Sequence, residues 1–160
     1  MLVQRNVDGS NAFNRSWAEF KVGFNDSRGN YWLGNDQLHQ LTMNYRYKLR
    51  FDLQVRSDHS WRYAEYSSFV VSSEADNYRM QVSGYSGNAG DWFSYNNNDE
   101  FTTYDRDNDR ISRNCAVENV GGFWYKNCAY ASVNAMKGNG YDDFEWHSLQ
   151  LESTRMWLMC

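Results

Sequence analysis

The clearest pattern in the chain is an alternation of apolar and polar residues over residues 47–56. The apolar positions of this alternation are Tyr47, Leu49, Phe51, Leu53 and Val55. Because successive side chains of a strand point to opposite faces, a period of two predicts a β-strand with one face in water. The segments 64–72 and 78–83 are predicted as two more strands, separated by a turn at 74–77. Strands joined by short polar turns are expected to pair antiparallel.

A longer apolar period predicts two short helices before these strands. Residues 15–22 carry Trp17 and Phe20 three positions apart on one helical face, and Asn14 has a side chain suited to the N-cap. A second helix is predicted over 35–41, with both of its leucines buried.

Beyond Ser83 the periodicity disappears. Gly, Asn, Asp and Ser dominate to about residue 114, and such a long irregular segment is typical of a functional region or of disorder. Interleaved aromatic residues argue against disorder, because they offer apolar surface for burial. They are Trp92, Phe93, Tyr95, Phe101 and Tyr104. We expect one α+β domain over 1–160, mainly antiparallel sheet with short helices: a scaffold over 1–83 and a loop-rich binding half over 84–160.

The composition argues against several classes of function. The net charge is −4 and there is no block of Lys or Arg, whereas nucleic acids and anionic membranes are bound by basic surfaces. No run of about 18 apolar residues exists, so no transmembrane helix is predicted. Aromatic residues make up 18% of the chain, and their large faces suit a packed domain with recognition loops.

No motif for catalysis is present. The histidines His39, His59 and His147 are scattered and lack metal-ligand spacing. A phosphate-binding loop, a dinucleotide fingerprint and a nucleophile elbow are all absent. The pair Asp142-Asp143 is too common a sequence to indicate acid–base catalysis. We therefore predict that the protein is not an enzyme.

Three aspartates, Asp105, Asp107 and Asp109, occupy alternate positions of one short run. This spacing places carboxylates on one side of an extended or looping backbone, and hard cations such as Ca²⁺ prefer oxygen ligands of this kind. The run is not an EF-hand, because Arg110 stands in place of the required glycine and Ala116 in place of the closing glutamate. The alternative is a solvated acidic turn, since Asp and Asn are ordinary turn formers.

A series of short motifs surrounds this run. In chain order they are Val3-Gln4-Arg5, Asp8-Gly9-Ser10, Phe13-Asn14-Arg15-Ser16-Trp17, Gly23-Phe24, Tyr31-Trp32-Leu33-Gly34-Asn35, Leu38-His39-Gln40-Leu41-Thr42, Gly84-Tyr85-Ser86-Gly87-Asn88-Ala89-Gly90-Asp91, Phe101-Thr102-Thr103, Asn114-Cys115-Ala116, Gly122-Phe123-Trp124-Tyr125 and Cys128. Their ordered combination, from about Val3 to about Met156, closely resembles the fibrinogen C-terminal domain, also called the fibrinogen-related domain. Ficolin, tachylectin and angiopoietin domains are examples of this family.

The resemblance implies a calcium site. By residue, the ligands would be the side chains of Asp107 and Asp109 and the carbonyl oxygens of Ile111 and Arg113. Asp105 is expected to orient the loop rather than to bind the ion. Two carboxylates with several neutral oxygens predict weak binding, about 10⁻⁴ M or looser, as in extracellular modules.

The resemblance also implies a disulfide between Cys115 and Cys128, and secretion. The family carries a further segment upstream of the Val-Gln-Arg motif, and this segment and a signal peptide are missing after Met1. We therefore expect a fragment or a shortened member. The alternative is a cytosolic protein with three free thiols. Cys160 is left over, as a free thiol, a link to another chain or a result of fragmentation.

A recognition pocket is expected beside the disulfide. Its predicted residues are Glu118, Asn119, Trp124, Tyr125, Cys128, Ala129 and Tyr130. In the lectin branches an aromatic residue and a histidine occupy the positions of Asn119 and Ala129, and the loop at 136–143 is longer. These departures weaken the prediction of an acetyl-binding pocket.

Two functions therefore stay open. The first is an extracellular, calcium-dependent, lectin-like module that binds carbohydrate or acetylated ligands, as in innate immunity. The alternative is a protein- or receptor-binding module of the fibrinogen or angiopoietin type. The replaced pocket residues favour the second, whereas the abundant aromatic residues favour the first. No nucleic acid or membrane insertion is expected, and oligomerisation is expected to depend on segments outside this chain.

Overall fold

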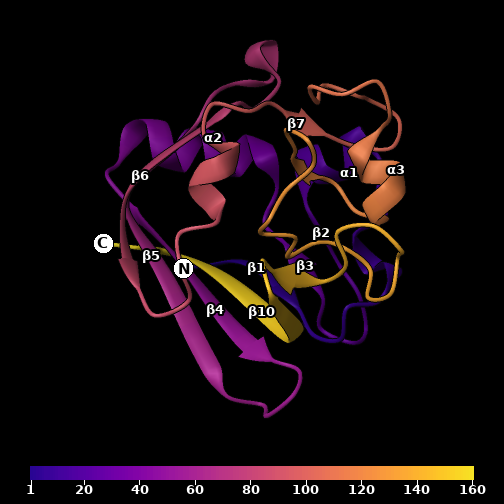
Figure 1. Ribbon diagram of the computed structural model, residues 1–160. Coiled ribbons are helices and arrows are strands. Elements are labelled where there is room, and N and C mark those ends of the chain that lie inside the picture. The colour runs from indigo at the N-terminus through magenta and orange to yellow at the C-terminus, as the bar shows by residue number, and fades with distance from the viewer.

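The computed structural model describes residues 1–160, and its framework is one antiparallel sheet (Figure 1). The strand order is β2-β3-β1-β10-β4-β5-β6, with β9 paired to β10. The strands are β1 (Leu2–Asn6), β2 (Phe24–Asn25), β3 (Tyr31–Trp32), β4 (Lys48–Val55), β5 (Trp61–Val71), β6 (Met80–Gly87), β9 (Glu145–Trp146) and β10 (Leu149–Met159). A separate ribbon pairs β7 (Phe101–Thr102) with β8 (Phe123–Trp124). The predicted α+β fold is confirmed.

The alternating segment forms β4 as predicted. Leu49, Phe51, Leu53 and Val55 are buried, and the intervening side chains are not. The next two predicted strands correspond to β5 and β6, which pair antiparallel to each other. β5 begins three residues earlier than predicted, and β6 begins two residues later and ends four residues later. The added ends are paired with neighbouring strands, Trp61 with Gln54 and Gly87 with Ala64, rather than held by buried side chains.

The strand β10 was not predicted, and it lies in the centre of the sheet. It pairs with β1 on one side and with β4 on the other. A register shift between Leu151 and Ser153 places Leu151 and Thr154 on the buried face, three residues apart, which hides the period of two. The proposed scaffold of 1–83 is therefore incomplete in space, since its middle strand comes from the other half of the chain.

The first helix is α1 (Trp17–Val22), and its N-cap is Ser16 rather than the predicted Asn14. The Ser16 hydroxyl accepts a hydrogen bond from Glu19 N (3.2 Å), and the Glu19 carboxylate accepts one from Ser16 N (3.3 Å). This reciprocal capping box satisfies two amide groups, which the side chain of Asn14 does not reach. Trp17 and Phe20 are buried as predicted.

The second helix, α2 (Asn35–Asn44), continues three residues past the predicted end. Leu38 is fully buried, and Leu41 is half-buried against the core. The extension includes Thr42, whose hydroxyl accepts from Val71 N of β5 (2.9 Å) and donates to Leu38 O (2.8 Å). Within the predicted range, His39 Nδ1 donates to Val71 O (2.9 Å). The remaining helical segments are α3 (Cys115–Asn119), η1 (Asn11–Phe13), η2 (Glu74–Asp76) and η3 (Phe93–Asn96).

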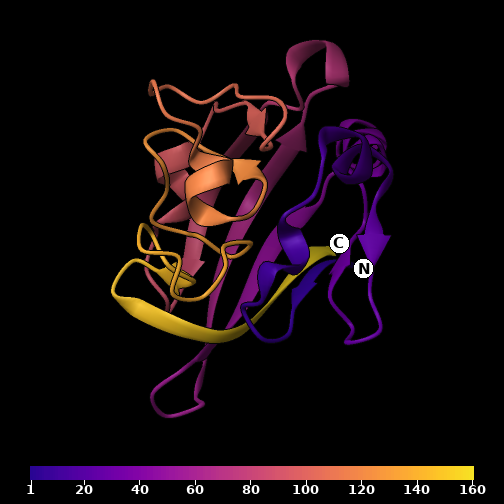
Figure 2. The same cartoon turned by 90° about the vertical axis from the view of Figure 1, so that its right-hand side faces the viewer.

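The irregular half of the chain lies on one face of the sheet (Figure 2). Trp124 is the main contact between the two layers. Its ring is 5.1 Å from that of Phe101, 5.9 Å from Phe69 and 6.0 Å from Trp32, and its Nε1 donates to Tyr78 O (2.8 Å). Burial of an indole with a satisfied N–H joins the layers without a polar penalty.

Replacement of Ser16 by alanine tests the helix boundary. Ser16→Ala should lower the free energy of unfolding by about 1 kcal/mol, because the capping box is lost. Asn14→Ala, at an exposed position, should change it by less than about 0.5 kcal/mol. Urea denaturation measures both values, and equal losses would contradict the assignment of Ser16 as the N-cap.

Candidate functional site

The acidic run forms a loop between β7 and α3 that is tied to three parts of the fold. The Asp105 carboxylate accepts from Trp17 N (2.9 Å), which fastens the loop to α1. Asn108 N donates to the Thr102 hydroxyl (3.0 Å) of β7. Arg110 N donates to the carbonyl oxygen of Lys126 (3.1 Å), beyond β8. Asp105 thus has an orienting role, as predicted from the sequence.

The carboxylates of Asp107 and Asp109 have no cationic partner within the chain. Asp109 accepts from Ile111 N (3.1 Å) and from Cys115 N (2.9 Å), and Asp107 accepts from Asp109 N (3.2 Å). Burial raises the pKa of Asp109 to about 6, and the neighbouring charge of Asp107 adds to this rise. Two adjacent carboxylates therefore share a region without a countercharge.

This donor set fits a calcium ion. The residues offer hard oxygen ligands and an unbalanced negative charge, which are the requirements of Ca²⁺. No group of three or more His, Cys, Asp or Glu side chains is arranged to hold a metal. Main-chain oxygens, such as the predicted carbonyls of Ile111 and Arg113, would therefore have to complete the coordination.

The predicted disulfide is present, between Cys115 at the start of α3 and Cys128. Asn114 caps this short helix, because its side chain accepts from Ala116 N (2.8 Å) and Val117 N (3.1 Å). The acidic loop is thus joined directly to a helix end that the disulfide holds. Cys160 is a free, exposed thiol.

The predicted pocket residues lie mostly below the surface. Trp124, Tyr125, Cys128 and Ala129 are buried, so they form the floor of this region rather than a face that a ligand could touch. The Tyr125 hydroxyl donates to Gly121 O (2.6 Å) inside the core. The side chain of Glu118 is 9% exposed, and only Tyr130, at 41%, reaches well into solvent.

Asn119 has a structural role that explains why an aromatic residue is absent there. It is fully buried, and its Nδ2 donates to the Asp142 carboxylate (2.9 Å) while its Oδ1 accepts from Asp142 N (3.2 Å). Its carbonyl oxygen also accepts from Met136 N (2.9 Å). Asn119 therefore fastens the short 136–143 loop against α3, which an aromatic side chain could not do.

Four carboxylates gather beside this loop and form an acidic patch of Glu118, Asp142, Asp143 and Glu145. Glu118 is paired with Arg113, and Asp143 lies 3.7 Å from Arg56. Asp142 and Glu145 have no cationic partner. Burial raises the pKa of Asp142, and burial together with Asp142 and Asp143 raises the pKa of Glu145 to about 7. The sequence analysis did not identify this patch.

An aromatic cluster of Trp92, Tyr95, Tyr130 and His147 lies close to the acidic patch. Tyr130 is at its centre, with ring centroids 4.7 Å from Tyr95, 5.5 Å from His147 and 5.6 Å from Trp92. His147 stacks on Trp92 at 3.8 Å although its φ of 52° is unfavourable for a residue with a side chain. The cluster adjoins the patch, because His147 follows Glu145 by two residues and its backbone N–H donates to Tyr130 O (2.6 Å).

Three separate segments supply this aromatic cluster, so no sequence spacing could have indicated it. The aromatic content of the irregular half was the only signal, and it pointed to burial rather than to a shared surface.

Comparison with known proteins identifies the family. The family described as "Fibrinogen beta and gamma chains, C-terminal globular domain" matches residues 1–156. The chain belongs to this family. Protein scabrous of Drosophila melanogaster is 40% identical over 159 residues, which cover 96% of the chain and 20% of that protein. Microfibril-associated glycoprotein 4 of Mus musculus is 39% identical over 139 residues, covering 83% of the chain and 54% of that protein. This fibrinogen C-terminal domain therefore spans only part of these relatives.

Solved structures agree with this assignment. The fibrinogen-like globe domain of human ANGPTL2 has a TM-score of 0.89 at 36% identity, covering 98% of this chain and 78% of that one. Lamprey fibrin D-dimer, complexed with the peptide ligand Gly-His-Arg-Pro-amide, has a TM-score of 0.87 at 29% identity, covering 98% and 60%. No helix of this fibrinogen C-terminal domain is long and apolar enough to cross a membrane.

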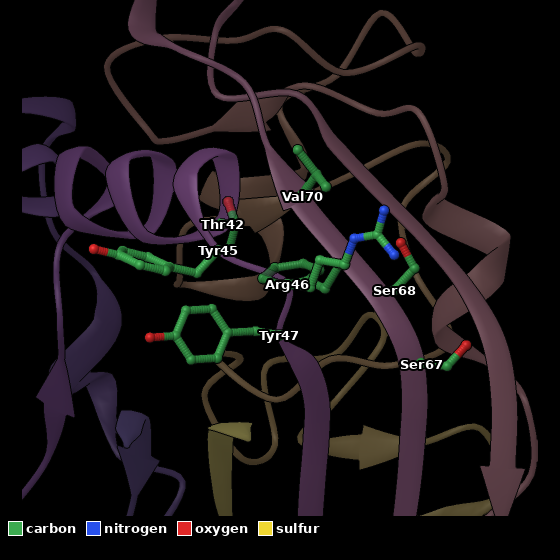
Figure 3. Close-up of a pocket in the computed structure, with 8 residues that line it drawn as sticks. Thr42, Tyr45, Arg46, Tyr47, Ser67, Ser68 and Val70 are labelled. Carbon is green, nitrogen blue, oxygen red and sulfur yellow. The ribbon is translucent and has the colours of Figure 1, made fainter. Parts of the chain in front are cut away.

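The cavities of this fibrinogen C-terminal domain lie away from the acidic patch and the aromatic cluster. One of about 390 Å³ lies beside the end of α2 and β5, and the Arg46 side chain extends across it toward Ser68 (Figure 3). Another, of about 440 Å³, lies beside Met1 and α2. None of the five cavities includes a residue of the patch or the cluster. The candidate site is therefore an open surface and not an enclosed pocket.

The pKa of Glu145 predicts a pH effect on stability. A folded-state pKa near 7, above the ordinary 4.5, means that this group stabilises the fold at low pH and that the stabilisation is lost as the pH rises through 7. Glu145→Gln removes this dependence. The melting temperature of the variant relative to wild type should therefore increase between about pH 4.5 and pH 7.

Glu152→Gln in β10 is the matched control, because it removes one carboxylate from the neighbouring strand. Its melting temperature should follow that of the wild type across the same pH range. Parallel curves for Glu145→Gln and wild type would contradict the environment described for Glu145.

Proposed function

We propose that this domain is an extracellular protein-binding module that receives a cationic group of a peptide or protein partner at the acidic patch. The observation that carries this proposal is the pair Asp142 and Glu145, two partly buried carboxylates without a cation. Leaving buried charge unpaired costs free energy, and a cationic ligand would recover it. The site would act by binding alone, and no catalytic step is needed.

The solved relatives support a peptide ligand. Gly-His-Arg-Pro-amide, bound to lamprey fibrin, carries an amino terminus, an imidazole and a guanidinium. Such groups complement carboxylates, and a guanidinium can bond to one in a bidentate manner. The aromatic cluster beside the patch would add contacts with the faces of Tyr130 and His147, since exposed aromatic rings bind cations and apolar groups.

Calcium-dependent binding of carbohydrate is the second candidate function. The exposed rings of Tyr130 and His147 favour it, because they offer flat surface for a sugar. The buried Ala129 and Asn119, together with the lack of a cavity at this position, argue against an enclosed acetyl pocket. Any sugar would lie on the open surface.

Calcium would be held by Asp107 and Asp109, with the carbonyl oxygens of Ile111 and Arg113. Bound there, it would supply the positive charge that these carboxylates lack and would join two turns of the loop. Arg110 lies between these residues and connects them to the recognition surface, because its N–H donates to Lys126 O and its guanidinium bonds to Asp99 (2.6 Å). Asp99 is 2% exposed, so the Arg110 guanidinium is bound to a carboxylate that the core holds in place. Calcium binding would restrict the motion of the loop, and through Arg110 it would also restrict residues 126–130.

Substitution of a predicted calcium ligand, Asp107, and of the orienting residue Asp105 tests calcium binding. Asp107→Asn should remove the rise in melting temperature that millimolar Ca²⁺ produces in the wild type, whose dissociation constant should be about 10⁻⁴ M or weaker. Asp105→Asn should lower the melting temperature but keep the calcium response, because Asp105 bonds to Trp17 N. A wild-type calcium response in Asp107→Asn, measured by calorimetry, would remove Asp107 from the site.

Titration with Gly-His-Arg-Pro-amide tests the ligand class. The wild type should bind it in millimolar Ca²⁺, and Asp142→Asn should weaken binding at least about tenfold, because a hydrogen bond to a charged group is worth about 1.5–3 kcal/mol. Asp58→Asn, in the exposed β4–β5 turn, removes the same charge outside the patch and should bind like the wild type.

N-acetylglucosamine is titrated in parallel. Binding of the sugar without binding of the peptide would favour the second candidate function. Equal peptide binding by wild type and Asp142→Asn would show that the acidic patch is not the site.

A further inference from the structure

The two edges of the sheet differ in how they are protected. At β6 the segment 97–99 covers the edge: Met80 N donates to Asp99 O (3.2 Å), and Asn98 N donates to Met80 O (3.0 Å). At the other end of the sheet, β2 has a partner on one side only, β3 (Figure 1). Open strand edges are sites of unwanted pairing between molecules, and proteins usually protect them.

The open strand β2 carries an N-glycosylation sequon, Asn25-Asp26-Ser27. Asn25 is exposed, and its side chain makes no hydrogen bond. The adjacent turn is held without it, because the Asp26 carboxylate accepts from Arg28 N (2.9 Å), Asn30 N (3.1 Å) and Asn30 Nδ2 (2.9 Å). The fold can therefore accept a large group on Asn25 without losing a contact.

We propose that Asn25 is an N-glycosylation site whose glycan covers the open edge at β2. This proposal rests on the extracellular location proposed above, since the modification is made in the secretory pathway. The donor is a lipid-linked oligosaccharide: a bond forms between Asn25 Nδ2 and the anomeric carbon of the sugar, the bond from that carbon to the lipid diphosphate breaks, and the amide loses one proton. No oxidant or reductant is required.

The surroundings of Asn25 give the glycan a surface to cover. Val22, at the end of α1, is 68% exposed and lies three residues away in sequence. Phe24, the other residue of β2, points to the opposite face of the strand, where its ring packs against Phe13 and Phe20. A hydrated glycan on Asn25 would therefore shield the outward face and the backbone of the edge strand. Its attachment point lies at the opposite end of the sheet from β6.

The test uses the chain fused to a cleavable secretion signal and expressed in eukaryotic cells. A second sequon occurs at Asn14-Arg15-Ser16, so all proteins carry Asn14→Gln, which leaves Asn25 as the one remaining acceptor. The secreted protein should lose the mass of one glycan on treatment with peptide N-glycosidase under native conditions. Asn25→Gln and Ser27→Ala should each abolish this loss, whereas Asn11→Gln, at an exposed asparagine outside any sequon, should retain it.

Absence of a glycosidase-sensitive mass on folded, secreted protein would overturn the proposal. Titration of the same samples with Gly-His-Arg-Pro-amide keeps the two proposals separate: loss of peptide binding would bear on the acidic patch, and loss of the glycan would bear on Asn25. Removal of the glycan should increase the rate of aggregation on warming, and an unchanged rate would contradict the protection of the edge.

Discussion

The irregular half of this domain depends on asparagine side chains that bond to backbone groups which no helix or strand pairs. Asn96 Nδ2 donates to Trp124 O (2.9 Å) and Cys128 O (3.0 Å), and Asn134 Nδ2 donates to Gly122 O (2.9 Å). Asn108 Nδ2 donates to Phe101 O (2.9 Å) in the same manner. Since a buried carbonyl without a partner costs free energy, these amides make it possible to pack loops against the sheet.

These buried amides explain why function can reside on so irregular a surface. The amides of Asn96 and Asn134 fix the backbone at 122–128 by hydrogen bonds to its carbonyl oxygens. The residues that follow this segment are therefore held in a defined position. Asn119 extends the same principle, because its amide and carbonyl hold the 136–143 loop and place Asp142 at the surface. A recognition site built from loops is thereby kept as rigid as one built on strands.

Negative charge is concentrated in two neighbouring regions, the acidic loop and the acidic patch. Each region contains two carboxylates without a cation, Asp107 and Asp109 in the loop and Asp142 and Glu145 in the patch, and burial together with mutual repulsion raises the pKa of Asp109 and of Glu145. The disulfide and α3 lie between the two regions and connect them. The arrangement suits a domain in which one cation stabilises the loop and another arrives with the ligand.

Local sequence determined much of this protein. The alternation of β4, the apolar faces of α1 and α2, and the ordered motifs from Val3 to Met156 each reflect nearest-neighbour rules, and they were sufficient for the fold class and the family. The disulfide also followed from the motifs that surround its two cysteines. Each single motif lies within a short stretch of chain, and the family assignment needed only their order along it.

Tertiary structure alone decided the position of β10, the N-cap of α1 and the composition of the recognition surface. A register shift hid the alternation of β10, and the choice of Ser16 over Asn14 depended on where Glu19 could reach. The aromatic cluster and the acidic patch draw on segments up to 55 residues apart, as for Trp92 and His147, so only packing brings them together. Trp124 and Tyr125 were expected around the recognition pocket and are buried, because large aromatic side chains gain most where two layers meet.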